Sequence, residues 1–244
     1  MAHPPIEAYE ELASTNAEAR RRAETGDSGP VWITAARQTA GRGRRGRDWS
    51  TGEGNLAATL LMPCDKPPAE AAQISFVAAL AAHDLAQACL GVGAASLKWP
   101  NDLMIHDRKA AGILVESGRS AAGLWLAVGI GVNLARYPTD VERPATAFAE
   151  HMAGHAPAPL AALEVLANAF ERWRGTWETQ GFPAIANAWT ARAHGLGKPC
   201  EARLHDSVVA GVAEGLDDDG ALRLRLPDGG LTRITAGDVF FGRA

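Results

Sequence analysis

The residues best suited to chemistry lie in a glycine- and arginine-rich segment at positions 41–47, with the sequence GRGRRGR. Its four guanidinium groups can make planar, bidentate contacts with carboxylates and phosphates. Its three glycines allow backbone N–H groups to approach a ligand closely. The segment has neither the Gly-Lys-Ser/Thr ending of a Walker A loop nor the pattern of a dinucleotide fingerprint. It predicts a loop that gathers a polyanion, although a solvated basic turn or an RNA-contacting patch has the same composition.

A second group of polar side chains lies in a stiff segment at positions 98–102, with the sequence KWPND. Pro100 restricts Trp99 to an extended backbone. The Asn-Asp pair that follows favours a turn, so that a lysine, an amide and a carboxylate are presented together. The alternative interpretation is a rigid turn whose tryptophan packs against the core.

Lys109 stands directly before an apolar run that predicts a buried strand. The chain holds only four lysines against twenty arginines, and Lys98 and Lys109 are two of the four. In such a chain, a lysine at the mouth of a strand indicates that a compact point charge is required there. An ordinary surface lysine is the alternative.

Two further segments have the composition of a binding site. Ser14, Thr15 and Asn16 carry hydroxyl and amide groups, although their spacing alone favours the N-cap of a helix. Residues 128–133, with the sequence VGIGVN, combine a β-type run with two glycines, which allows a flat ligand to lie close to a strand. A bulged core strand explains this second segment nearly as well.

The elements that position these motifs are mixed, without strict βαβ alternation. Helices are predicted over residues 16–24, 69–90, 160–178 and 185–193, and strands over residues 31–34, 56–62, 113–115 and 124–132, with a turn at Ser117-Gly118. We therefore expect an α+β domain over residues 1–195, in which helices flank a mixed or antiparallel sheet. Short strands over residues 201–204 and 221–226, separated by Asp-Gly turns, predict a small β-barrel-like domain over residues 196–244.

Composition restricts the class of protein and its compartment. The net charge of -4 gives no global basic field of the kind that nucleic-acid binders use. Cys64, Cys89 and Cys200 have neither the spacing of a metal site nor that of a disulfide framework. The N-terminus has no signal-peptide pattern, and no stretch approaches the roughly 20 apolar residues of a membrane span. We expect a cytoplasmic protein with no nucleic-acid or membrane partner.

Taken in order, the motifs resemble the biotin-protein ligase family. The resemblance rests on residues 14–16 (STN), 38–47 (QTAGRGRRGR), 98–102 (KWPND), 109–114 (KAAGIL) and 129–133 (GIGVN). It covers residues 6–244, because the C-terminal strands are similar to the small SH3-like domain of that family. It implies a catalytic domain similar to class II aminoacyl-tRNA synthetases. It also implies that ATP and Mg²⁺ convert biotin to biotinyl-5'-AMP, and that biotin then passes to a lysine of the apo biotin carboxyl carrier domain of acetyl-CoA carboxylase or a related carboxylase.

The resemblance also implies roles for individual residues. The implied biotin-binding residues are Ser14, Thr15, Asn16, Gln38, Gly41, Arg42, Gly43, Arg44, Lys109, Gly112, Gly129 and Gly131. The implied nucleotide-binding residues are Arg42, Arg44, Arg47, Trp49, Asn55, Lys98, Asn101 and Asn133. Lys109, Arg44 and Asp102 are the implied catalytic residues, with Lys109 as the central cation. Asp102 is also the candidate Mg²⁺ ligand and the candidate base for the acceptor lysine.

Two alternatives and one departure from the family pattern accompany this hypothesis. A lipoate-protein ligase has the same type of fold and adenylate chemistry, and a non-catalytic nucleic-acid-binding module would use the arginine loop alone. Only thirteen residues precede Ser14, so we expect a form without the N-terminal winged-helix repressor domain that many family members carry. The sequence leaves monomer and homodimer equally open.

Overall fold

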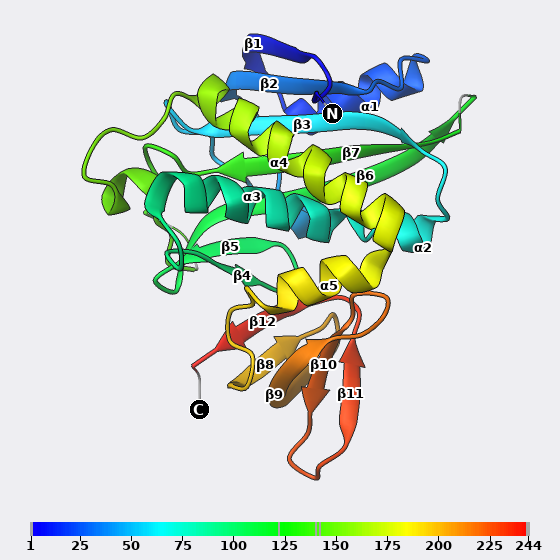
Figure 1. Cartoon of the computed structure of the whole chain (residues 1–244), viewed down its shortest axis with the longest axis vertical. Coiled ribbons are helices and arrows are strands. Elements are labelled where there is room, and N and C mark those ends of the chain that lie inside the picture. The colour runs from blue at the N-terminus through cyan, green and yellow to red at the C-terminus, as the bar shows by residue number, and fades with distance from the viewer. Residues whose placement is uncertain (1, 122, 140, 142, 243–244) are drawn as a thin grey trace.

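The structure is a computed structural model that describes residues 2–121, 123–139, 141 and 143–242. Its larger part is a seven-stranded sheet in the order β1-β2-β3-β7-β6-β5-β4 (Figure 1). The strands are β1 (Ile6–Leu12), β2 (Val31–Gln38), β3 (Leu56–Cys64), β4 (Ser96–Lys98), β5 (Asp102–Ile105), β6 (Arg108–Ser120) and β7 (Gly123–Val132). β1 pairs with β2 in parallel, and the other neighbours pair antiparallel. This mixed sheet with flanking helices confirms the predicted α+β class.

Helices cover both faces of the sheet because successive strand residues point to opposite sides. The helices are α1 (Thr15–Glu24), α2 (Pro68–Ala71), α3 (Ile74–Leu90), α4 (Pro159–Gln180) and α5 (Phe182–Thr190), with short 3₁₀ turns η1 (Arg44–Gly46) and η2 (Phe148–His151). Trp32 belongs to the apolar cluster that includes α3 and α4. The next residue, Ile33, belongs to the cluster on the other face, which includes Ala19 and Ala23 of α1. Helices α3 and α4 therefore pack on one face of the sheet, and α1 packs on the other.

The predicted helix over residues 69–90 is divided in two by the Ala72-Gln73 turn. The Gln73 N–H bonds the Glu70 carbonyl at 2.9 Å, which is the i→i+3 spacing of a 3₁₀ turn. By length and composition, the segment from Pro68 to Leu90 could cross a membrane. From the sequence, no segment is expected to come this close to a membrane span. However, 67% of this segment's most apolar window is buried inside the protein. Core packing therefore accounts for its apolar residues.

The hairpin of β6 and β7 is longer than predicted. Its strands pair as far as Ser120 and Gly123, so the predicted turn at Ser117-Gly118 is wrong. A Cβ at Gly118 would lie 2.4 Å from the ring of Trp125 on the facing strand. Gly118 therefore makes room for a cross-strand tryptophan and does not form a turn. Strands β1, β4 and β5 were not predicted.

The C-terminal part is a five-stranded antiparallel sheet in the order β11-β10-β9-β8-β12. Its strands are β8 (Pro199–Arg203), β9 (Val208–Leu216), β10 (Leu222–Arg225), β11 (Leu231–Ile234) and β12 (Asp238–Phe241). It lies below α5 (Figure 1), and the Trp99 indole donates a 3.0 Å hydrogen bond to the Gly220 carbonyl. Buried residues of this sheet, such as Ala202 and Leu222, belong to the same apolar cluster as α3. The two sheets are therefore joined through one core.

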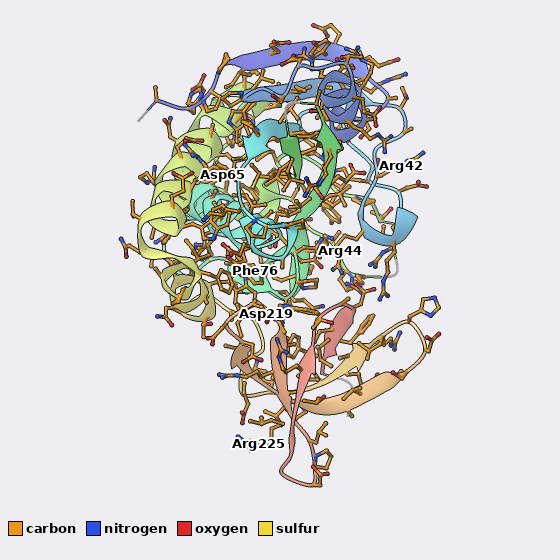
Figure 2. The ribbon with its side chains drawn as sticks, turned by 90° about the vertical axis from the view of Figure 1, so that its right-hand side faces the viewer. Arg42, Arg44, Asp65, Phe76, Asp219 and Arg225 are labelled. Carbon is orange, nitrogen blue, oxygen red and sulfur yellow. The ribbon has the colours of Figure 1, made fainter. Side chains whose placement is uncertain are left out.

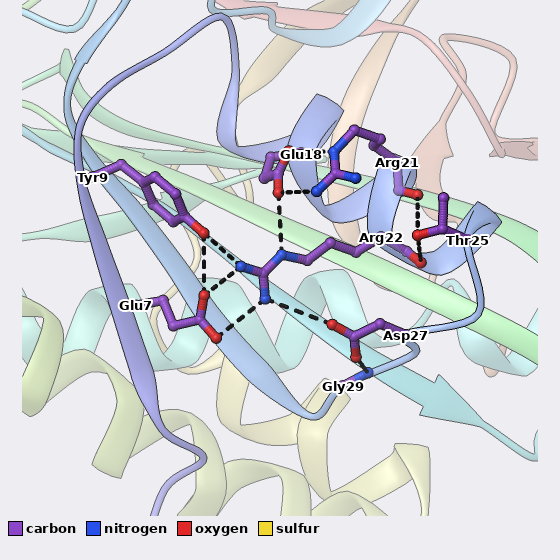
Figure 3. Close-up of polar contacts among 8 residues, drawn as sticks. All are labelled: Glu7, Tyr9, Glu18, Arg21, Arg22, Thr25, Asp27 and Gly29. Carbon is purple, nitrogen blue, oxygen red and sulfur yellow. Dashed lines mark hydrogen bonds and ion pairs between the residues drawn. The ribbon is translucent and has the colours of Figure 1, made fainter.

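Arg22 fastens strand β1 to helix α1, as Figure 3 shows. Its guanidinium bonds Glu7 and Tyr9 of β1 and lies 3.2 Å from the Glu18 carboxylate within α1. The hydrogen bond from Arg22 lowers the pKa of Glu7, and the hydrogen bond from Arg21 lowers that of Glu18. These contacts therefore fix the position of α1 relative to the sheet.

Candidate active site

The predicted site residues converge on one cavity of about 310 Å³, which lies against the central strands β3, β7 and β6 of the main sheet. Those that line it are Ser14, Thr15, Asn16, Gln38, Arg42, Gly43, Arg44, Arg47, Trp49, Asn101, Asp102, Lys109, Gly112, Gly129, Gly131 and Asn133. They come from five stretches of the chain that are far apart in sequence. Residues 138, 141, 143, 145 and 238 also line it and were not predicted.

One end of the cavity, which we call the amide end, is lined by the neutral polar side chains of Thr15, Asn16 and Gln38, and Thr59 supports it from behind. Gln38 Oε1 accepts hydrogen bonds from the Thr15 N–H at 2.8 Å and from its hydroxyl at 3.2 Å. The Thr59 hydroxyl lies 2.7 Å from Asn16 Oδ1, and Asn16 Nδ2 donates to Glu116 at 2.7 Å. Thr59 is fully buried, and nothing in its strand sequence marked it as part of a site. This end suits a neutral ligand that carries its own donors and acceptors.

Ser14 combines the two roles that its sequence left open. It is the N-cap of α1, with its side chain 3.5 Å from the Ala17 N–H, and it also lines the cavity. Thr15 and Asn16 are the first residues of the helix itself. The cap therefore sets the direction in which Thr15 and Asn16 enter the cavity.

The glycines of β7 allow site side chains to lie directly on the sheet. A Cβ at Gly129 would lie 2.1 Å from Asn16 Oδ1, and one at Gly131 would lie 2.4 Å from the Trp49 indole. The pairing of β7 with β3 and β6 runs through both glycines without a register shift, so the alternative of a bulged strand is wrong. Gly112 of β6 lies under the same indole, 3.2 Å away for an added Cβ. Trp49 thus covers a flat glycine surface beside the cavity.

The other end of the cavity is cationic. Lys109 Nζ lies 2.6 Å from Asp102 Oδ1 and 5.5 Å from the centre of the Trp49 ring. Asp102 is 4% exposed, so this ion pair is largely shielded from water. Arg44 donates a 3.2 Å hydrogen bond to Asn101 Oδ1. The Nδ2 atom of Asn101 in turn donates to the Ile113 carbonyl at 2.7 Å.

Arg44 is the most enclosed arginine that the sequence predicted for the site. Burial lowers the pKa of its guanidinium from the usual range, but an arginine remains charged in a protein. Figure 2 shows Arg42 and Arg44 at the same side of the larger domain, with Arg44 toward the C-terminal sheet. Both side chains line the cavity, where they can contact an anionic ligand.

Asp238 and Arg143 are charged cavity residues that the sequence did not predict. Asp238, the first residue of β12, lies 2.9 Å from Arg47, 3.2 Å from Arg45 and 3.4 Å from Arg143. Burial raises the pKa of this carboxyl, but the Arg47 hydrogen bond and the charges of Arg143 and Arg45 outweigh it, so the net pKa is lowered. Arg143 also lies 3.7 Å from Asp102. No local pattern marks these residues, because their partners are far away in sequence.

Three predicted ligand-binding residues lie outside the lining of the cavity. Gly41 stands behind it, where its carbonyl accepts a 3.0 Å hydrogen bond from the Trp49 N–H. Asn55 accepts hydrogen bonds from the backbone N–H groups of residues 135 and 136 at 2.9 and 3.1 Å. Lys98 lies under the rings of Phe240 and Phe241, and its burial lowers its pKa. These residues are placed to support the walls of the cavity, and their contact with ligand stays a prediction.

Asp102 fits poorly as a ligand for a metal ion. Its two carboxylate oxygens already face Lys109 and Arg143. Among the residues that the structure describes, no group of three His, Cys, Asp or Glu side chains is arranged to hold a metal.

The chain is similar to known proteins over most of its length. Residues 12–133 match the Biotin/lipoate A/B protein ligase family, and residues 195–242 match the Biotin protein ligase C terminal domain. A relative from Paracoccus denitrificans, named biotin–[acetyl-CoA-carboxylase] ligase, is 48% identical over 94% of this chain and 97% of its own length. The chain belongs to the biotin protein ligase family.

More distant members of the biotin protein ligase family are similar over most of the chain. A biotin–[acetyl-CoA-carboxylase] ligase from Mycobacterium tuberculosis is 32% identical over 96% of this chain and 88% of its own length. A biotin protein ligase from Aquifex aeolicus, solved in complex with biotin and ATP, superimposes with a TM-score of 0.84. It is 24% identical, and the match covers 98% of this chain and 99% of that one. At this identity, the structural match shows the shared fold.

Proposed function

We propose that this protein activates biotin with ATP to form biotinyl-5'-AMP. It then transfers the biotin to a lysine of the apo biotin carboxyl carrier domain of acetyl-CoA carboxylase or a related carboxylase. The observation that carries the proposal is the single cavity, which combines an amide end with a cationic end and joins all five sequence motifs. The Paracoccus relative, which is named biotin–[acetyl-CoA-carboxylase] ligase and is 48% identical, supports the same activity.

Biotin fits this cavity in one direction. Its neutral ureido ring matches the hydrogen-bonding groups of Thr15, Asn16 and Gln38 at the amide end. Its carboxylate then points toward the cationic end, where Arg44 and Lys109 lie. In the opposite direction, a carboxylate would face the Glu116 side of the amide end, and the ureido groups would face only cations.

The first half-reaction joins two anions. A biotin carboxylate oxygen attacks the α-phosphorus of ATP, an O–P bond forms, and the bond to the β-phosphate oxygen breaks to release pyrophosphate. Cations fixed around the reacting atoms lower the barrier, because charge repulsion and reorganisation are the main obstacles. Lys109 is held by Asp102 at 2.6 Å, and Arg44 is held by Asn101 at 3.2 Å, so both are oriented before the ligand arrives.

The second half-reaction transfers the acyl group. The ε-amine of the carrier lysine attacks the biotinyl carbonyl carbon, an amide forms, and AMP leaves with the electrons of the broken C–O bond. The attacking lysine must lose a proton, since its ordinary pKa is about 10.4. Asp102 is our candidate acceptor of this proton. To accept it, the Asp102 carboxylate must weaken its ion pair with Lys109.

We divide the chain into a catalytic domain over residues 1–195 and a C-terminal domain over residues 196–244. The free thiols Cys64, Cys89 and Cys200 fit a reducing compartment, and we place the enzyme in the cytoplasm. Magnesium enters the proposal as a companion of ATP, held mainly by phosphate oxygens and water.

The decisive test is ATP-dependent transfer to an apo carrier domain followed by mass spectrometry. We expect one biotinyl group on the carrier with biotin and ATP, none without ATP, and none when lipoate replaces biotin. A lipoyl adduct formed in preference to a biotinyl adduct would refute the choice of substrate. An unmodified carrier together with nucleic-acid binding would refute the enzymatic function.

A further inference from the structure

The four arginines of residues 41–47 fall into two pairs with different surroundings. Arg42 and Arg44 line the cavity, and within the described residues neither forms an ion pair with a carboxylate. Arg45 and Arg47 face Asp238 of the C-terminal sheet, at 3.2 and 2.9 Å, although Arg47 also lines the cavity. The loop therefore carries two cations that are available to a ligand and two that are already bound to the other domain.

Asp238 is built to hold these cations. The residue is 8% exposed, its two oxygens lie 2.9 and 3.0 Å from Arg47 Nη2, and Arg143 approaches from the other wall of the cavity. A buried carboxylate that faces three guanidiniums stays ionised and makes strong, charge-assisted hydrogen bonds. Strand β12 pairs with β8 over four residues, so Asp238 has a fixed position in the C-terminal sheet.

The backbone of the loop indicates the same contact. Arg45 has a φ of 58°, in the left-handed region that side chains other than glycine rarely adopt. Such a conformation persists only where the surrounding contacts hold it in place. The contact in reach of the Arg45 guanidinium is the Asp238 carboxylate.

Arg143 extends the charged contacts to the catalytic centre. It lies 3.4 Å from Asp238 and 3.7 Å from Asp102, whose other oxygen holds Lys109 at 2.6 Å. Its guanidinium also rests 4.5 Å from the centre of the Phe240 ring on β12. Alternating charges thus run without a break from the C-terminal sheet to the central cation.

We propose that Asp238 is a positioning residue that docks residues 41–47 onto the C-terminal domain and so keeps the loop closed over the activated intermediate. Arg45, Arg47 and Arg143 are its partners, while Arg42 and Arg44 remain for the ligand. Only the identity of the intermediate rests on the proposed function. The docking itself is a property of the ligand-free protein.

The test compares Asp238→Asn with a matched control, Glu214→Gln. Glu214 pairs with Arg225 in the same C-terminal sheet, and within the described part of the chain it forms no ion pair with residues 41–47. The first readout is the rate of trypsin cleavage after Arg42 or Arg44 in the ligand-free protein, with the products identified by mass spectrometry. The second is the rate at which pre-formed biotinyl-5'-AMP leaves the enzyme. We expect Asp238→Asn to raise both rates about tenfold, the effect of losing a charge-assisted contact, and Glu214→Gln to leave both unchanged.

Arg47→Gln tests the same contact from the side of the loop. The Arg47 side chain is 44% exposed, so the substitution leaves the core intact even if Asp238→Asn weakens the fold. Combined with Asp238→Asn, it should add little to adenylate release, because the two residues act through one contact.

Three results would overturn the docking role. The first is unchanged cleavage and release in either folded single variant. The second is a double variant whose effect is the product of the two single effects. The third is slower adenylate release in Asp238→Asn, which would mean that the carboxylate competes with the ligand. Loop cleavage needs no biotin or ATP, so it separates failure of the docking role from failure of the proposed function.

Discussion

The two ends of the cavity are built in different ways. The amide end is made of neutral side chains on α1, β2 and β3, whose partners lie within the larger domain, as in the contact of Thr59 with Asn16. The cationic end depends on a loop and on ion pairs that cross to the other domain, as in the contact of Arg47 with Asp238. The first arrangement favours fixed recognition of a neutral ring. The second favours charge stabilisation in a part of the site that opens and closes.

The largest expected effect is at the cationic end. Lys109→Ala should slow adenylate formation by about a hundredfold or more, because it removes a fixed charge from the reacting atoms. Pyrophosphate release is the measurement. Lys109→Arg should also be impaired, since a planar guanidinium does not occupy the position of an ammonium. Adenylate formation near the wild-type rate in Lys109→Ala would show that the central cation is a different residue.

A substitution at the amide end should act on binding and spare the chemistry. Gly129→Ala places a Cβ 2.1 Å from Asn16 Oδ1, so Asn16 must leave its position. We expect biotin affinity to fall by about tenfold, the value of one or two hydrogen bonds, in calorimetric titration. Gly175→Ala is the matched control, because an added Cβ there meets no atom within 4 Å apart from the neighbouring backbone of its own helix. Equal biotin affinity in the two variants would contradict the assignment of this end to biotin.

Ionic strength should separate the two ends without any substitution. Salt shortens the screening length from about 10 Å at 0.1 M to about 3 Å at 1 M, which weakens exposed charge pairs most. The KM for ATP should therefore rise several-fold over this range. The Kd of biotin amide, which keeps the ureido ring but has no carboxylate for the cationic end, should change by less than twofold when it is measured without nucleotide. An equal salt dependence of both quantities would mean that the ends do not differ in this way.

The smallest effect is expected from the contacts that fasten β1 to α1. Glu7→Gln removes an exposed partner of Arg22 and should cost less than about 1 kcal/mol of unfolding free energy at neutral pH. The Arg22 hydrogen bond lowers the pKa of Glu7, so its stabilisation is complete above the ordinary value of 4.5 and is lost as the pH falls through the lowered pKa. Denaturant unfolding should show the wild type and the variant converging below pH 4.5. A difference that grows in acid would contradict this sign.

Local sequence was sufficient to find most of the site and much of the fold. The arginine loop, KWPND and the glycines of β7 carry their chemistry in adjacent residues, and each contributes residues to the lining of the same cavity. Helices α1 and α4 follow from caps and apolar spacing, within one or two residues of their observed ends. The sequence left the role of the β7 glycines open. In the structure, Gly129 makes room for Asn16 and Gly131 makes room for Trp49 in a regular strand.

The parts that could not be predicted depend on contacts between distant residues. Thr59 is an ordinary strand residue until α1 places Thr15 and Asn16 beside it. Asp238 and Arg45 are 193 positions apart, and no spacing rule connects them. Strand β1 is rich in acidic residues and pairs in parallel with β2 through α1, so neither its composition nor its local order revealed it.

The single apolar core shared by both sheets determines how the protein should unfold. Ala202 and Leu222 of the C-terminal sheet pack into the same buried cluster as Leu80 of α3, and the Trp99 indole reaches across to Gly220. Separating the sheets would expose this apolar surface to water, so we expect each part to be less stable without the other. Heat or denaturant should therefore produce one cooperative transition, and the slowest amide protons of both sheets should exchange at the same global rate.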